Sequence, residues 1–391
     1  MDAEQVRRDY ISRALDGLRR DRRALHRIPE LGHTEFKTQR YILDSLRPLA
    51  PDALHPIADT GVRCVFMGRA PLEEGERRRT IALRADMDAL NVAETTGLDF
   101  CSERPGFMHA CGHDGHMATM LAVARFCAEQ RDHLRCNVTI LFQPAEELDG
   151  GAERIIAQNG MKNPDVDEVY GMHVMPSLPS GKVACPDGPL MASTCELDIT
   201  ISGLASHGAL PHLGHDALAA AVALYGLLQT VFTRQTDPFD QKVLTIGAME
   251  AGERRNVVAD KAVMHATLRT YDEAVEARCL ELMRNHMRAI ELAYGVNCRM
   301  DILSRYLPVI NDHYAAERVR TVAGDMCVDV NPLTIAEDFS FYQRQAPGAF
   351  FFCGIAQGDM YSHSLHASDF DLDESSLLNG LKIFIGLIDI G

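Results

Sequence analysis

Apolar and polar positions follow one another along the first half of the chain in the order typical of an α/β domain. Residues 1–26 have apolar positions spaced for an amphipathic helix, whereas Thr80–Asp86 and Asn137–Phe142 are short apolar runs of strand length. Between these two runs, Gly115–Gln130 has the pattern of a helix. This order predicts a sheet covered by helices, in which ligands gather in loops beyond the carboxyl ends of the strands.

A second group of elements follows the stretch from Pro176 to Pro189, whose prolines and glycines indicate a domain boundary. The pattern then predicts a strand, a helix, two strands, a helix and a final strand. These elements are Thr194–Ser202, Asp216–Arg234, Lys242–Glu250, Ala262–Tyr271, Asp272–Tyr294 and Asn297–Ser304. Their order is that of a ferredoxin-like α+β unit. We therefore expect an inserted domain over 189–304 and a first domain formed by 1–188 and 305–391.

Length, charge and cysteine content narrow the class of protein. A chain of 391 residues is long enough for two domains with a hydrophobic core. Its 55 acidic and 39 basic residues give a net charge of −16, which disfavours nucleic acids and anionic membrane surfaces as partners. No apolar run suggests a membrane span, and the 11 cysteines lack paired spacing. We expect reduced thiols and a cytoplasmic location.

The densest group of candidate ligands lies in Met108–His116, which contains one cysteine and three histidines ahead of a helical run. Thiolate and imidazole ligands at this density indicate a transition metal. The alternative is a structural thiol among incidental histidines. Within this stretch His109 and His116 are the weakest candidates, because a neighbour of a ligand often serves only to pack, and we place His109 outside the site.

Two adjacent carboxylates, Glu146 and Glu147, follow the apolar run that ends at Phe142. At the end of a strand such a pair can divide the work of metal-assisted hydrolysis, since one carboxylate can bind metal while the other takes a proton from the attacking water. Two solvated glutamates at the start of a helix are the alternative interpretation. His173 ends another strand-like run and His366 lies in a polar loop, and either could be an ordinary histidine of the core or surface.

Together these segments resemble the M20-type metallohydrolases, in the amidohydrolase branch that includes hippurate hydrolases and indole-acetyl amino acid hydrolases. The resemblance extends over nearly the whole chain and consists of short motifs in a fixed order. The motifs are Leu25–Glu30, Leu83–Asp88, His109–His116, Gln143–Glu147, Gly171–His173, His207–His212, Asn256–Val258, Ala336–Phe339 and Leu365–His366.

The resemblance implies a fold and a set of functional residues. The fold is an α/β, zinc-peptidase-like (phosphorylase/hydrolase-like) sheet domain with an inserted ferredoxin-like lid domain, through which relatives form homodimers. Two divalent ions, zinc or manganese with cobalt or nickel also acceptable, would be bound by Cys111, His113, Glu147, His173 and His366. Glu146 would be the general base. In the lid, His207 would face the oxyanion, and Asn256 and Arg269 would hold the substrate.

The chain departs from many relatives where it has Arg84-Ala-Asp86 in place of a His-x-Asp pair of ligands. The first histidine is therefore absent, and the Cys111/His113 pair belongs to the branch that replaces it. Asp86 is then expected to orient a ligand rather than to bind metal itself. Arg269, for its part, could either bind a substrate carboxylate or pair with an acid inside the lid.

The implied activity is metal-dependent hydrolysis of the amide bond of N-acyl amino acids, such as N-acetyl or N-benzoyl derivatives, to a carboxylic acid and a free amino acid. The expected partner is thus a small molecule, with neither nucleic acid nor membrane involved. A dipeptidase or carboxypeptidase of the same family would use the same metals and base. A catalytically inactive binding homologue is a third possibility, against which the intact Glu146 and the full ligand set argue.

Overall fold

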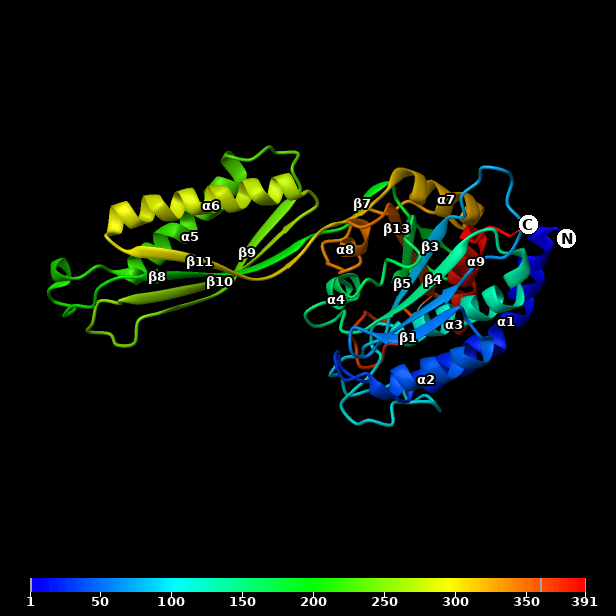
Figure 1. Ribbon diagram of the computed structural model, residues 1–391. Coiled ribbons are helices and arrows are strands. Elements are labelled where there is room, and N and C mark those ends of the chain that lie inside the picture. Colours follow the sequence, from blue (N-terminus) through cyan, green and yellow to red (C-terminus); the bar gives the residue numbers. More distant parts are fainter. Residues whose placement is uncertain (1, 359–360, 391) are drawn as a thin grey trace. The chain divides into compact units, whose positions relative to one another are not determined.

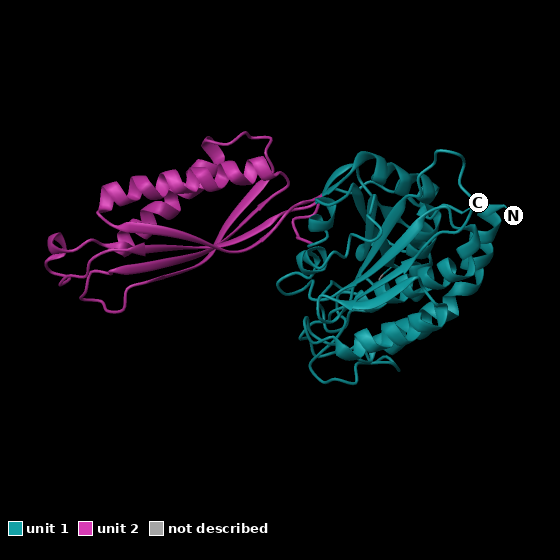
Figure 2. Cartoon of the chain, in the orientation of Figure 1, with its two compact units in different colours: residues 1–190, 310–331, 338–391 teal, residues 191–309, 332–337 magenta. Residues whose placement is uncertain are grey.

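The computed structural model describes residues 2–358 and 361–390, which form two compact units (Figures 1 and 2). The first unit comprises 1–190, 310–331 and 338–391, and the second comprises 191–309 and 332–337. The segment 332–337 therefore belongs to the second unit, although the sequence placed it in the first domain.

A seven-stranded mixed sheet forms the centre of the first unit, with the strand order β1-β2-β4-β3-β5-β13-β6. Its strands are β1 (Ala53–Ile57), β2 (Gly61–Phe66), β3 (Thr80–Asp86), β4 (Asn137–Gln143), β5 (Glu168–Pro179), β6 (Val183–Ala184) and β13 (Gly348–Ala356). The four central strands, β4, β3, β5 and β13, run parallel. Every residue of β3 and β4 is buried, which explains why both read as continuous apolar runs rather than alternating ones.

Helices cover this sheet (Figure 1). They are α1 (Ala3–His26), α2 (Phe36–Leu46), α3 (His113–Glu129), α4 (Ala152–Ala157), α7 (His313–Ala323), α8 (Ser340–Gln343) and α9 (Leu377–Leu387), with short 3-10 turns at 47–49, 131–133, 324–326 and 374–376. The buried helix α3 packs on β3, β4 and β5 and also contacts α1 and α9. The helices predicted at residues 1–26 and 115–130 are confirmed as α1 and α3.

The proline-rich stretch 176–189 is less of a break than its composition indicates. The strand β5 continues to Pro179, which pairs with Ala356 of β13, and β6 also belongs to the first sheet. Proline is tolerated at such a strand end because few ladder hydrogen bonds remain to be made. The chain passes between the two units through β7 (Gly188–Met191) and β12 (Val309–Asn311), which pair with each other, and again on either side of 332–337.

The second unit has the ferredoxin-like order predicted from the sequence. Its elements are β8 (Thr194–Ser202), α5 (Ala217–Arg234), β9 (Lys242–Ala251), β10 (Lys261–Thr270), α6 (Glu273–Tyr294) and β11 (Asn297–Tyr306), with a 3-10 turn at 211–213. The antiparallel sheet has the strand order β11-β8-β10-β9, and α5 and α6 pack on β10. Both helices begin at an aspartate, Asp216 or Asp272, whose side chain accepts hydrogen bonds from the first turn.

Helix α5 has two apolar faces, and by length and composition it could cross a membrane. One face, with Leu224 and Leu228, is buried in the core of the second unit. The other carries Leu218, Val222 and Tyr225, which are 42–59% exposed. The apolar residues of α5 therefore form two faces, one that packs in the core and one that is an exposed apolar stripe.

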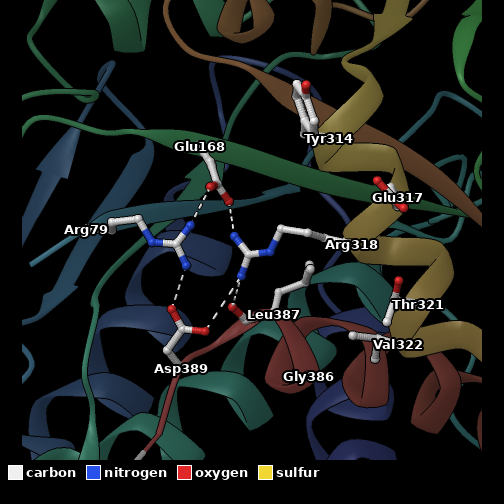
Figure 3. Close-up of a pocket in the computed structure, with 10 residues that line it drawn as sticks. All are labelled: Arg79, Glu168, Tyr314, Glu317, Arg318, Thr321, Val322, Gly386, Leu387 and Asp389. Atoms are coloured by element: carbon white, nitrogen blue, oxygen red, sulfur yellow. Dashed lines mark hydrogen bonds and ion pairs between the residues drawn. The ribbon is translucent and has the colours of Figure 1, made fainter.

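A pocket of about 540 Å³ lies at the amino ends of the parallel strands, opposite the edge where the sequence predicts chemistry (Figure 3). Two arginines and two acids that line it pair with one another. Arg79 donates to Glu168 at 2.8 Å and to Asp389 at 2.6 Å, and Arg318 pairs with both acids as well. These four residues therefore link Asp389 to β5 and α7, and the pocket is not the candidate site.

Candidate metal centre

The candidate ligands gather at the carboxyl ends of the parallel strands. The strands β3 and β4 end at the paired residues Asp86 and Gln143, and His173 lies on β5. His113 is the first residue of α3. Since parallel strands end at one edge of a sheet, the fold brings these separate segments together at that edge.

Cys111, His113 and His173 form a first group, whose ligand atoms all lie within 4.8 Å of one another. The Cys111 Sγ is 3.3 Å from the His173 Nε2. The Nδ1 of His113 lies 2.9 Å from the Asp88 carbonyl, and the Nδ1 of His173 lies 2.7 Å from the Val174 carbonyl. A carbonyl only accepts, so each Nδ1 carries the proton and each Nε2 keeps its lone pair for a metal.

Cys111 also belongs to a second group with Glu147 and His366. The Glu147 Oε1 lies 3.1 Å from the His366 Nε2. His366 has a left-handed backbone, with φ of 66°, and its N–H donates to the Ala110 carbonyl at 2.8 Å, which fixes the C-terminal loop beside the cysteine. One thiol shared by two ligand groups has the arrangement in which a thiolate bridges two cations.

Glu146 lies at the edge of these groups. Its carboxylate is within 4.8 Å of the ligand atoms of His113 and Glu147. The preceding residue, Ala145, has a positive φ of 56°, so the backbone turns sharply just before the two glutamates. Adjacent residues can therefore present both carboxylates to the same space.

The electrostatics of the centre favour bound cations. Burial together with Glu147 and Glu146 raises the pKa of the Cys111 thiol, so a thiolate is unfavourable here without added positive charge. Burial lowers the pKa of His173 to about 3, which keeps this imidazole neutral. A thiol, three imidazoles and a carboxylate fit divalent transition metals, and within the described part of the chain the buried Nε2 of His113 has no hydrogen-bond partner.

The structure accounts for both ring nitrogens of His116. Its Nδ1 donates to the Asp86 Oδ1 at 2.6 Å, and its Nε2 accepts from the Val174 N–H at 3.0 Å. His116 thus has no free lone pair to offer a metal. His109, which the sequence left out, is buried, and neither of its ring nitrogens has a hydrogen-bond partner among residues 2–358 and 361–390.

Asp86 lies between a guanidinium and two imidazoles. Its Oδ2 accepts from the Arg84 Nη1 at 2.6 Å and is 3.7 Å from the His113 Nε2. Burial opposes a charge on His113, but Asp86 and Asp88 outweigh it and raise the His113 pKa to about 10, so a metal ion bound at Nε2 would have to displace a proton. These contacts are compatible with the expected orienting role of Asp86, which remains a prediction.

Two contributions to this site were missed by the sequence interpretation. Asp88 contacts two of the proposed ligands. Its backbone carbonyl accepts from the His113 Nδ1, and its Oδ2 accepts from the Glu147 N–H at 2.9 Å. Arg84 donates from Nη2 to Asp338 at 2.9 Å. Asp88 and Asp338 lie in the quoted motifs, but nothing in their spacing reveals which backbone or side chain they contact.

The three predicted lid residues all belong to the second unit. His207 and Asn256 are exposed and lie on neighbouring segments, joined by the Gly208 N–H that donates to the Asn256 carbonyl at 2.8 Å. Arg269, on β10, donates to the Thr334 carbonyl at 3.1 Å. Across the described part of the chain it has no carboxylate partner, so the alternative of an acid pair inside the lid finds no support.

The model of peptidase family M20/M25/M40 matches residues 82–389. The chain belongs to this family. It is 37% identical over 359 residues to an N-acetyldiaminopimelate deacetylase from Exiguobacterium sibiricum, which covers 91% of this chain and 94% of that protein. It is 34% identical over 380 residues to an N-acetyl-L-cysteine deacetylase from Bacillus subtilis, with 96% and 88% covered.

Among solved structures, the M20 fold agrees with a dinuclear metal-binding peptidase of this family from Bacillus subtilis. The TM-score is 0.82 at 30% identity, with 97% of this chain and 98% of that chain covered. The predictions of an M20 metallohydrolase of the amidohydrolase type, and of a sheet domain with a lid, are confirmed. Together with the two ligand groups, this neighbour supports a centre for two divalent ions.

Proposed function

We propose that this M20 enzyme hydrolyses the amide bond of N-acyl amino acids, releasing a carboxylic acid and a free amino acid. The observation that carries the proposal is the position of Glu146 beside two ligand groups that share Cys111. Relatives named as deacetylases of N-acetyldiaminopimelate and N-acetyl-L-cysteine support a small acyl group and an amino-acid leaving group.

In this proposal five residues hold the two ions. They are Cys111, His113, Glu147, His173 and His366. Zinc or manganese suits this mixture of sulfur, nitrogen and oxygen donors, and cobalt or nickel would also be accepted. When bound, the ions would polarise the substrate carbonyl and make water more acidic.

Glu146 would take the proton of the attacking water and pass it to the nitrogen of the leaving amino acid. His207 would donate to the oxygen on which negative charge develops, and Asn256 and Arg269 would hold polar groups of the substrate, the guanidinium suiting a carboxylate. Because these three residues belong to the second unit, we expect turnover to include closure of that unit over the substrate.

A homodimer formed through the second unit is part of the proposal. The exposed stripe of Leu218, Val222 and Tyr225 on α5 is an apolar surface that a second copy would cover, and β9 is an edge strand of the same sheet. A cytoplasmic location also remains a prediction, supported by the 11 free cysteines.

The test measures release of free amino acid from N-acetyl, N-benzoyl and longer N-acyl amino acids beside dipeptides, with protein loaded with zinc or manganese and a chelated control. We expect chelator-sensitive cleavage of acyl substrates, and a loss of turnover in Glu146→Gln of about 100-fold or more with both ions retained. A preference for dipeptides would support the peptidase alternative. If protein with both ions bound cleaves no substrate of the panel, the result would favour an inactive binding homologue.

A further inference from the structure

The loop between β4 and α4, residues 144–151, carries both Glu146 and Glu147, and its backbone is strained at the start. Ala145 is fully buried and has a left-handed φ of 56°. The Gly150 N–H donates to the Ala145 carbonyl at 3.0 Å and closes the loop on itself. Residues other than glycine avoid this conformation unless their surroundings impose it. Some neighbouring group must therefore hold Ala145 in place.

The turn between α1 and α2, residues 31–35, makes three separate contacts with this loop. The Glu35 Oε1 accepts the Ala145 N–H at 2.9 Å. His33 contacts the Asp149 carboxylate through its Nε2. A Cβ at Gly32 would lie 2.8 Å from the Ala145 Cα, so only glycine allows the two segments to approach this closely. The 31–35 turn therefore packs directly against the 144–151 loop, through residues 32, 33 and 35.

Glu35 is the central contact of this turn. It is the residue that caps α2, yet its side chain makes no hydrogen bond to that helix. Instead, it is completely buried, and its Oε2 accepts from the Thr60 hydroxyl at 2.6 Å while its Oε1 accepts from Ala145. Burial raises the pKa of Glu35 to about 7. The role of Glu35 therefore depends on the hydrogen bonds that its two carboxyl oxygens accept rather than on its charge.

The 144–151 loop is held at two further backbone N–H groups. Glu147 donates to Asp88, and Gly151 donates to Asp338, each at 2.9 Å. Asp88 also contacts the ligand His113. Asp338 contacts Arg84 and lies within 4.8 Å of the Glu146 carboxylate. The Glu35 carboxyl accepts from Thr60 and Ala145, so it can be altered without removing a group that contacts a metal ligand.

We propose that Glu35 is a positioning residue for the proposed base and metal-binding carboxylate. By accepting the Ala145 N–H it holds the left-handed turn that presents Glu146 and Glu147 to the same space. The proposal rests on the proposed function for the role of Glu146, but its effect on Glu147 concerns metal binding and can be measured independently of any substrate.

The test compares Glu35→Ala with Glu35→Gln and with the control Glu30→Ala. A glutamine can still accept from Ala145 and donate to the Thr60 hydroxyl. Glu30 is a matched control, since it is also buried beside the same turn, but its Oε2 accepts from the Lys37 and Thr38 N–H groups of α2, at 2.8 and 3.0 Å, rather than from the 144–151 loop.

For Glu35→Ala we expect kcat to fall about 10- to 100-fold with KM nearly unchanged, and one of the two ions to bind more weakly in a titration of the chelated protein with zinc or manganese alone. Glu35→Gln should restore both quantities. Glu30→Ala should lower the thermal unfolding midpoint to a similar extent as Glu35→Ala while keeping kcat and ion binding.

Equal losses in Glu35→Ala and Glu30→Ala, in proportion to their unfolding midpoints, would overturn the proposal, as would wild-type kcat and ion binding in Glu35→Ala. If the wild-type protein cleaves no substrate of the panel, the proposed function fails by itself. Ion binding by the same three variants then decides whether Glu35 positions the loop.

Discussion

Arg84 and Asp338 form a buried ion pair at 2.9 Å, although 254 residues separate them in the chain. Neither side chain is exposed. Arg84 also donates to Asp86 and to the Gln143 side chain, so one guanidinium links the ends of β3 and β4 to the segment before α8.

Replacing Arg84 by methionine should destabilise the protein by about 3–5 kcal/mol, because two buried carboxylates, Asp86 and Asp338, lose their cation. The free energy of unfolding in urea measures this. The control Arg77→Met removes an exposed partner of Asp167 and should change stability little. A loss in Arg84→Met no larger than in this control would show that the buried pair contributes little.

Cys111→Ser should weaken the binding of both ions, because the thiol is shared by the two ligand groups and a hydroxyl is a poorer ligand for transition metals. Metal content after dialysis against a weak chelator should fall below two ions per chain, and turnover should fall with it. Cys101→Ser, at a half-buried cysteine outside both groups, should retain two ions. Two tightly bound ions in Cys111→Ser would contradict the shared role.

His26 provides a pH-dependent contribution to stability. Its Nδ1 lies 2.8 Å from Asp114 and its Nε2 lies 3.3 Å from Glu94. Burial opposes a charge on the ring, but Asp114 and Glu94 outweigh it and raise the His26 pKa to about 9. The folded protein thus holds this proton more tightly than the unfolded chain, in which the pKa is about 6.5.

The stabilisation from His26 should be complete below pH 6.5 and lost as the pH rises to 9. Unfolding free energies measured across this window should fall by up to about 3 kcal/mol through this group. In His26→Gln the fall should be smaller by that amount. An equally steep fall in the variant would assign the alkaline loss of stability to other groups.

The proposed dimer predicts that Val222→Glu, in the exposed apolar stripe of α5, yields a monomer, because a buried unpaired carboxylate is costly at an interface. Light scattering after size-exclusion chromatography measures the mass. Leu292→Glu is the control, since Leu292 is 90% exposed on α6 and lies outside the stripe. A monomeric wild-type protein, or an unchanged dimer in Val222→Glu, would contradict an interface through this stripe.

Much of the fold follows from local patterns that can be read along the chain. The helix α3 and the strands β3 and β4 lie where apolar spacing placed them, because the faces of an element that must be buried depend on its own side chains. The end of β5 does not follow in this way. Pro176 and Pro179 indicate a break by composition, but pairing with β13 continues the strand through them.

For the candidate site, the sequence proposed the ligand residues but not the hydrogen-bond partners of their side chains. Cys111, His113 and Glu147 stand out because their side chains are metal ligands at close spacing. His116 looks equivalent to His113 in sequence, yet Asp86 and the Val174 N–H occupy both of its ring nitrogens. Which nitrogen is free depends on the partners that β3 and β5 bring to the ring, and no local pattern encodes them.

The sequence by itself determined the order of the elements, the insertion of a ferredoxin-like unit and the chemical types of the donors, because periodicity and composition act over a few residues. Only the tertiary structure decided that Arg84 meets Asp338 and that Glu35 holds Ala145, contacts between residues 254 and 110 positions apart. The physical reason is that a hydrogen bond requires two atoms within about 3 Å, and packing of the whole unit sets that distance.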